Sequence, residues 1–137
     1  MKKIILLLLL AMGTVQFSIA QQVGVVTSNK PGWHKIGEAV VDFKADRDAI
    51  IVAGADKFKA IRLVVTDAPI RFDDLEVYYE NGTKEDIQVR NIFKSGEKTR
   101  IIDLKGYNRN LKRVVFVYRS IPNWRGQKAH VELYGLK

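Results

Sequence analysis

Cysteine is absent from this chain of 137 residues, and histidine occurs only twice. The absence of cysteine excludes disulfide bonds, thiolate metal sites and a cysteine nucleophile. The longest apolar run, from Ile4 to Met12, is about half the ~20 residues that a membrane-spanning helix needs. With 47% hydrophobic and 28% charged residues, the chain has the composition of a folded globular domain held by packing alone.

The first twenty residues have the pattern of a secretory signal peptide. Lys2 and Lys3 give a short basic start before the apolar run, and Ser18 and Ala20 supply small residues at the positions that signal peptidase reads. We therefore expect a signal peptide at 1–20, a loose N-terminal segment at 21–32 and one domain at 33–137. The protein is expected to be exported, to the periplasm or beyond the cell, with no membrane span after signal removal.

The remaining chain has the period of β-strands rather than that of helices. In the run 59–66, Ile61, Leu63 and Val65 share one face, and the run 75–80 alternates in the same way. The run 114–118 is apolar on both faces, which predicts a strand at the centre of its sheet. About nine short strands predict an all-β sandwich of two antiparallel sheets, jelly-roll or Ig-like. A small closed β-barrel is the alternative.

One hairpin can be predicted to the residue. The Asn-Gly pair at 81–82 usually makes a two-residue loop, which would set Glu76 opposite Ile87. A three-residue loop with Gly82 in the left-handed conformation instead pairs Leu75 with Ile87. Because a slip of one residue turns every side chain to the other face, burial of the two apolar residues favours the three-residue loop.

Alternation also predicts which residues are buried. Val114, Phe116 and Tyr118 are the bulkier members of their strand, and we assign them to the core. Trp33 is assigned to the core as well, since Ile36 and a strand follow it closely. His130 alternates with apolar neighbours, which indicates an exposed strand residue.

No catalytic constellation stands out. Zinc sites need three or four ligands at recognisable spacing, and no serine lies in a G-x-S-x-G turn, so we expect no metal and no cofactor. The remaining option is a small carboxylate-dependent hydrolase, because paired acids can hydrolyse a glycoside. Its candidate acids are Asp42, Asp46, Asp48 and Asp73. The simpler interpretation is that these acids solvate turns.

Charge is distributed unevenly along the chain. Gln21–Thr83 holds 8 basic and 10 acidic residues, whereas Lys84–Lys137 holds 13 basic and 5 acidic ones. A basic half attracts polyanions. After export these would be anionic envelope polymers or glycans rather than nucleic acid. A dispersed, soluble charged surface is the alternative.

Two polar turns and one strand end supply the candidate ligand-binding residues. These are Trp124, Arg125, Arg119, Tyr107 and Arg109. An exposed tryptophan stacks on a sugar ring, and arginine binds carboxylate or phosphate through two hydrogen bonds. Alternatively, Trp124 folds back over one end of the sandwich. We expect a non-catalytic binding module of the cell envelope for a polyanionic or glycan ligand; an accessory subunit bound to an envelope protein is a further possibility.

A series of short packing and turn motifs covers nearly the whole chain after residue 32. The motifs are Trp33-x-x-Ile36-Gly37, Phe58-x-x-Ile61-x-Leu63-x-Val65, Val77-x-Tyr79-x-Asn81-Gly82, Ile101-Ile102-Asp103-Leu104-x-Gly106-x-x-Arg109, Val114-x-Phe116-x-Tyr118 and Val131-x-Leu133-x-Gly135. The series resembles a family of small exported bacterial domains of unknown function. The resemblance implies a β-sandwich in the envelope and brings no catalytic residue. It singles out Arg109, for which an Arg–Asp brace across a turn is an equal explanation.

Overall fold

The computed structural model describes residues 30–41, 46–52, 56–122 and 126–137, and β-strands are the regular secondary structure of this part of the chain. The nine strands are β1 Trp33–Val40, β2 Arg47–Ile51, β3 Lys57–Phe58, β4 Ala60–Thr66, β5 Ile70–Tyr79, β6 Lys84–Phe93, β7 Ile102–Asp103, β8 Arg109–Ser120 and β9 His130–Leu136. The expected signal peptide and residues 21–29 of the expected loose segment lie outside the described residues.

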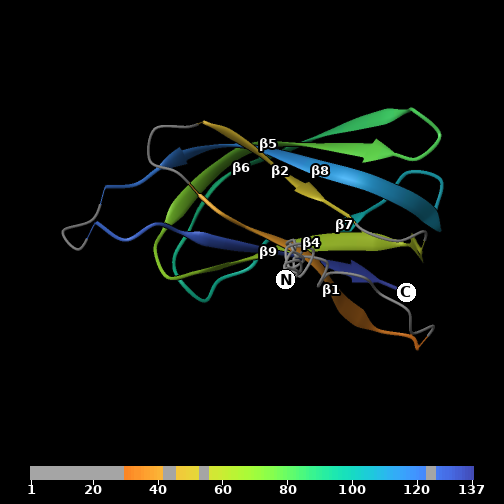
Figure 1. Cartoon of the computed structure of the whole chain (residues 1–137), viewed down its shortest axis with the longest axis horizontal. Coiled ribbons are helices and arrows are strands. Elements are labelled where there is room, and N and C mark those ends of the chain that lie inside the picture. Colours follow the sequence, from red (N-terminus) through yellow and green to blue (C-terminus); the bar gives the residue numbers. More distant parts are fainter. Residues whose placement is uncertain (1–29, 42–45, 53–55, 123–125) are drawn as a thin grey trace, which may run out of the picture.

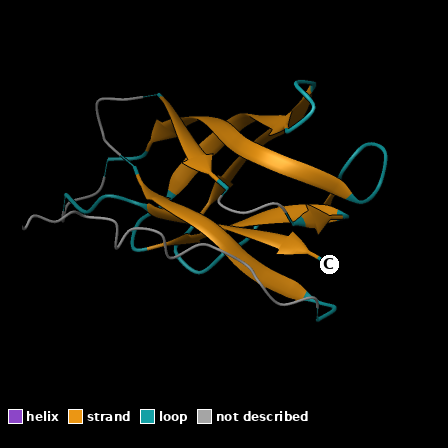
Figure 2. Ribbon diagram, turned by 45° about the vertical axis from the view of Figure 1, so that its right-hand side comes forward, coloured by secondary structure: helices purple, strands orange, loops and turns teal. Residues whose placement is uncertain are grey.

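The strands form two antiparallel sheets that face each other as a sandwich (Figure 1). One sheet has the order β1-β9-β4-β7, and the other has the order β2-β8-β5-β6 with β3 also paired to β8. Figure 2 shows the same two layers from a second direction, with loops gathered at their ends. The predicted sandwich is confirmed, and the alternative of a closed barrel is wrong, because the two sheets do not join into one.

The core lies between the sheets and consists of the inward-facing residues of both. β8 is an interior strand, as predicted, and Val114, Phe116 and Tyr118 are fully buried. The Phe116 ring packs edge-on against Phe72, with ring centres 5.6 Å apart, and lies 5.3 Å from the Tyr118 ring. Aromatic contacts of this kind add to the burial of apolar area, which is what holds a chain without disulfides together.

The β5–β6 hairpin has the predicted three-residue loop. Leu75 pairs with Ile87, and the Tyr79 amide donates to the Thr83 carbonyl at 3.0 Å. Gly82 is left-handed, with φ of +90°. Burial of the two apolar partners has therefore selected this register over the two-residue loop.

A β-bulge interrupts the outer strand of this hairpin. Phe72 pairs with Asn91, but Asp74 pairs with Gln88, so β6 carries one extra residue between these pairs. Arg90 lies in the bulge with φ of +50°, a conformation that non-glycine residues seldom adopt. The bulge bends β6, which is the edge strand of its sheet.

The placement predicted for Trp33 is wrong. Trp33 pairs with Leu136 on the outer face of the four-stranded sheet, and the Arg62 guanidinium lies 4.4 Å from the centre of its ring. Residues three apart in a strand point to opposite faces, so only one of Trp33 and Ile36 can enter the core. Ile36 is the fully buried one.

The exposure predicted for His130 is also wrong. Its side chain is only 25% exposed. β9 lies between β1 and β4, so Val40 and Thr66 flank His130 on the outer face of the sheet. An interior strand shields even its outward side chains, and the sequence of β9 alone does not show this.

Candidate functional site

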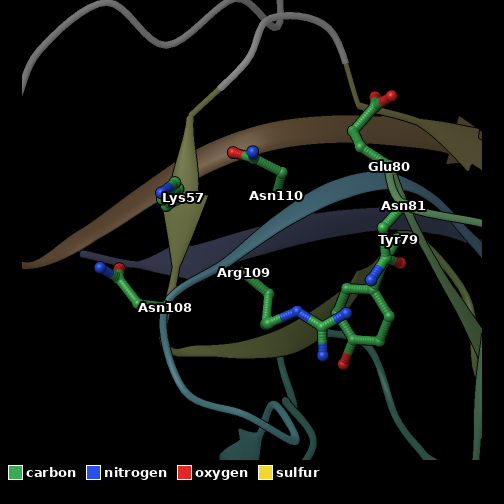
Figure 3. A pocket seen from close by; sticks show the side chains of 7 residues that line it. All are labelled: Lys57, Tyr79, Glu80, Asn81, Asn108, Arg109 and Asn110. Atoms are coloured by element: carbon green, nitrogen blue, oxygen red, sulfur yellow. The ribbon is translucent and has the colours of Figure 1, made fainter. Parts of the chain in front are cut away.

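A corner between the two sheets forms a polar pocket at one end of the sandwich. β3 pairs with β8, whereas β4, which begins two residues after β3, pairs with β9 in the other sheet. The β5–β6 turn and the start of β8 lie beside the point where the chain passes from one sheet to the other, between β3 and β4. They enclose a pocket of about 230 Å³, which we call the end pocket. It is lined by Lys57, Tyr79, Glu80, Asn81, Asn108, Arg109 and Asn110 (Figure 3).

Arg109 is fixed in the end pocket by contacts on three sides. Its guanidinium carbon lies 3.8 Å from the centre of the Tyr79 ring, and Figure 3 shows the two groups stacked. Nη1 donates to the Lys105 carbonyl at 2.7 Å, and Nη2 donates to the Thr83 hydroxyl at 3.2 Å. The guanidinium is therefore pre-organised, which reduces the conformational entropy that a ligand must remove on binding.

The loop before β8 depends on a glycine to close over Arg109. Gly106 has φ of +89°, and a Cβ atom there would lie 3.1 Å from Nη1 of Arg109 and 3.3 Å from its Cδ. The next two residues, Tyr107 and Asn108, are also left-handed, with φ of 57° and 50°. Such a run of unusual conformations persists only where surrounding contacts hold it.

Tyr79 forms the floor under the guanidinium. Its hydroxyl donates to Oε1 of Glu85 at 2.6 Å, and the same oxygen accepts the Lys105 amide at 3.1 Å. Burial of the phenol, together with its hydrogen bond to the Glu85 carboxylate, raises the pKa of Tyr79 well above its ordinary value. The phenol therefore stays protonated and acts as a fixed donor within the fold.

The rest of the end pocket is rich in hydrogen-bonding groups. Figure 3 shows Lys57 and Asn108 on one side, and Glu80 and Asn81 on the other. Two cations, one carboxylate and three side-chain amides line the pocket in total. Ammonium, guanidinium and amide groups donate to carboxylates, phosphates and hydroxyls, so this arrangement suits an acidic, hydroxyl-rich ligand.

The structure places one of the residues that the sequence nominated as ligand contacts in the end pocket and a second in the adjoining loop. Arg109 lines the end pocket, and Tyr107 lies in the adjoining loop with 63% of its surface exposed. The Lys59 ammonium is 5.5 Å from the centre of the Tyr107 ring. The brace inferred for Arg109 does exist, but it uses the Lys105 carbonyl and the Tyr79 ring rather than an aspartate.

The other nominated residues do not join this pocket. Arg119 is at the opposite end of β8, about 30 Å away at the ordinary rise of a strand. Its side chain is 72% exposed, and Nε lies 3.3 Å from Oδ2 of Asp73. Trp124 and Arg125 lie outside the described residues.

The acids proposed for a hydrolase are dispersed. Asp42 lies outside the described residues, and Asp46 is exposed next to β2. Oδ1 of Asp48 accepts the Ala49 amide at 2.9 Å. The two oxygens of Asp73 are contacted by Arg71, at 2.9 Å, and by Arg119. Asp48 therefore accepts a hydrogen bond within its own strand, and Asp73 is paired with two arginines, one of them on the neighbouring strand β8.

A charged cluster on the outer face of the four-stranded sheet is not evident from the sequence. Ligand atoms of Glu38, His130 and Glu132 lie within 4.8 Å of one another. The Lys35 ammonium contacts the Glu38 carboxylate and lies 3.3 Å from Glu132. Its hydrogen bond to Glu38 lowers the pKa of Glu38 and raises the pKa of Lys35. Pairing between β1 and β9 creates this cluster, because Lys35 and Glu38 lie on β1 whereas His130 and Glu132 lie on β9.

Comparisons with known proteins give one family and one structural likeness. The family model described as "Domain of unknown function (DUF2541)" matches residues 4–135. No curated protein matches the chain. A solved structure of Pseudomonas aeruginosa AlgX is similar over 75% of this chain, with 10% identity and a TM-score of 0.49. The match covers 26% of that chain, so the present chain spans about a quarter of its length.

Within the described residues, no helix is long and apolar enough to cross a membrane.

Proposed function

The chain belongs to the family of domains of unknown function DUF2541, and from its own residues we propose that it is an exported binding module for an acidic glycan of the cell envelope. The observation that carries this proposal is the convergence of Arg109, Lys57 and three asparagine amides on the end pocket. Export is proposed from the signal-peptide pattern of the first twenty residues.

The ligand class follows from the chemistry of the pocket. The stacked guanidinium of Arg109 offers a donor fork that suits a sugar carboxylate, and the Lys57 ammonium adds a second positive charge. Amide groups satisfy sugar hydroxyls, and Tyr107, which is exposed two residues before Arg109, offers a ring for the apolar face of a sugar. A neutral glycan would supply no anion to these two cations.

The first test measures binding of polygalacturonate by isothermal titration calorimetry at several salt concentrations, with neutral dextran as comparison. We expect polygalacturonate to bind, dextran not to bind, and affinity to fall as salt rises, because carboxylate contacts release counterions. Lys57→Gln should weaken binding about tenfold, the size of one charge-assisted hydrogen bond.

Lys94→Gln is the matched control, because it removes one positive charge as Lys57→Gln does. Lys94 follows the last residue of β6, whereas the β5–β6 loop that borders the end pocket precedes the first residue of β6. Lys94→Gln should change affinity by less than about twofold, as exposed charges far from a site do. Equal losses in the two variants would show attraction to the overall positive charge instead of a site. Failure of polygalacturonate to bind at low salt would reject the proposal.

A further inference from the structure

A second hollow lies on the outer face of the four-stranded sheet. It has a volume of about 340 Å³ and is lined by Trp33, Arg62, Val64, Lys98 and Tyr134. We call it the sheet-face groove. Arg62 on β4 pairs with Tyr134 on β9, and Lys98 forms an isolated β-bridge with Val64. Together with Trp33 on β1, three strands and the segment before β7 contribute to the groove. None of the residues that the sequence nominated as ligand contacts lines this groove.

The sheet-face groove contains two cations, and one of them, Arg62, is positioned by an aromatic ring. The Arg62 guanidinium lies against the Trp33 ring at 4.4 Å, which fixes its position. Among the residues that the structure describes, no carboxylate lies within ion-pair distance of Arg62 or Lys98. Each cation therefore keeps its hydrogen-bonding capacity for a ligand.

Glu132 is an acid at the border of the groove, because it pairs with the lining residue Val64. Glu132 accepts the Tyr134 hydroxyl at 3.0 Å and lies 3.3 Å from the Lys35 ammonium. It shares the Lys35 ammonium with Glu38, and it is not among the residues that line the groove. The groove keeps a net positive lining next to two aromatic rings, an arrangement that folding does not require, because these side chains point away from the core.

We infer that the sheet-face groove is a second binding site for acidic sugars, at which a sugar carboxylate contacts Arg62 and Lys98 while the ring lies against Trp33 or Tyr134. The inference takes its ligand class from the proposed function but uses a separate set of residues. Aromatic rings with a guanidinium also suit single-stranded nucleic acid, which serves as the competing outcome of the test.

The experiment uses the chain's tryptophan fluorescence. The chain has two tryptophans, so Trp124→Phe leaves Trp33 as the only reporter. In this background, titration with trigalacturonate should change the fluorescence with a saturable curve. Arg62→Gln and Lys98→Gln should each weaken this apparent affinity about tenfold or more. Lys57→Gln, in the end pocket, should leave the curve unchanged.

Arg113→Gln is the matched control for Arg62→Gln. Arg113 also stacks on an aromatic ring, with its guanidinium carbon 4.0 Å from the centre of Tyr78, but on the outer face of the other sheet. It should leave the fluorescence curve unchanged. If Arg62→Gln disturbs the circular dichroism spectrum, Arg62→Lys, which keeps the charge but loses the fork, replaces it and should still weaken binding.

The outcomes separate this inference from the proposed function. Calorimetric binding that Lys57→Gln weakens, without any Trp33 signal, would overturn the sheet-face site and leave the end pocket standing. A Trp33 signal that Arg62→Gln abolishes and Lys57→Gln preserves supports the second site even if the end pocket fails. A signal given by a thymidine oligonucleotide but not by trigalacturonate would overturn the inference, as would equal losses in the Arg62 and Arg113 variants.

Discussion

The phenol of Tyr79 connects the end pocket to the stability of the fold. Its ring stacks against the Arg109 guanidinium, and its hydroxyl donates a hydrogen bond to the Glu85 carboxylate. Deprotonation would place two negative oxygens 2.6 Å apart beside a buried ring. The pKa of Tyr79 is therefore raised by burial first and by Glu85 second, and the folded state holds this proton more tightly than the unfolded chain does.

This shift predicts a loss of stability in alkali. An unfolded tyrosine has a pKa of about 10. The raised pKa of Tyr79 therefore adds its full contribution to the free energy of unfolding below pH 10, and this contribution declines as pH rises above that value. Tyr79→Phe removes the titrating group, and its free energy of unfolding should fall less steeply above pH 10. Urea unfolding between pH 7 and 11.5 measures this. Tyr107→Phe, at an exposed ring, should keep the wild-type slope; equal slopes for wild type and Tyr79→Phe would contradict the prediction.

Strand pairing could be predicted where burial allowed a single solution. The β5–β6 register followed from the sequence because only one loop length buries both Leu75 and Ile87. The position of Trp33 did not, because Trp33 and Ile36 lie on opposite faces of one strand and a register shift between Lys35 and Gly37 interrupts its alternation. The two-residue strand β3 is too short to show a period at all, and its pairing with β8 depends on contacts distant in sequence.

The corner made by β3 and β9 is closely packed, and a single methyl group tests it. A Cβ on Gly135 would lie 2.6 to 2.9 Å from three atoms of the Phe58 ring. Gly135→Ala should therefore lower the free energy of unfolding by about 1–3 kcal/mol, the usual cost of overpacking. Denaturant unfolding measures this change.

Phe58→Leu provides the companion variant. Leucine removes part of the ring that the new methyl group would meet, so the double variant should cost less than the sum of the two single changes. Strict additivity, or an unchanged midpoint for Gly135→Ala alone, would show that the corner yields without strain.

β8, with twelve residues, extends from one end of the sandwich to the other. Arg109 at its start stacks on Tyr79, whereas Arg119 near its end contacts Asp73. The sequence could pair Tyr107 with Arg109, because the two residues are close along the chain. It could not supply Lys57 or Tyr79, which reach the end pocket from β3 and β5.

This separation predicts unequal effects of two arginine variants on glycan binding. Arg109→Lys keeps the charge but loses the planar fork and should weaken polygalacturonate binding about tenfold. Arg119→Gln should leave affinity within about twofold and alter the free energy of unfolding by no more than about 1 kcal/mol, since its ion pair is exposed. Calorimetry and urea unfolding on the same preparations check both. A larger effect of Arg119→Gln on affinity would mean that the ligand contacts the other end of the sandwich.

The bulge at Arg90 has a consequence for the behaviour of the protein at high concentration. An edge strand of ten residues exposes a row of backbone donors and acceptors with which a strand of another copy could pair. The extra residue and the left-handed turn of Arg90 break the regular spacing of that row and place a charged side chain within it. Sheet-to-sheet aggregation through β6 is thereby disfavoured, which protects a chain that has no disulfides to restrain partial opening.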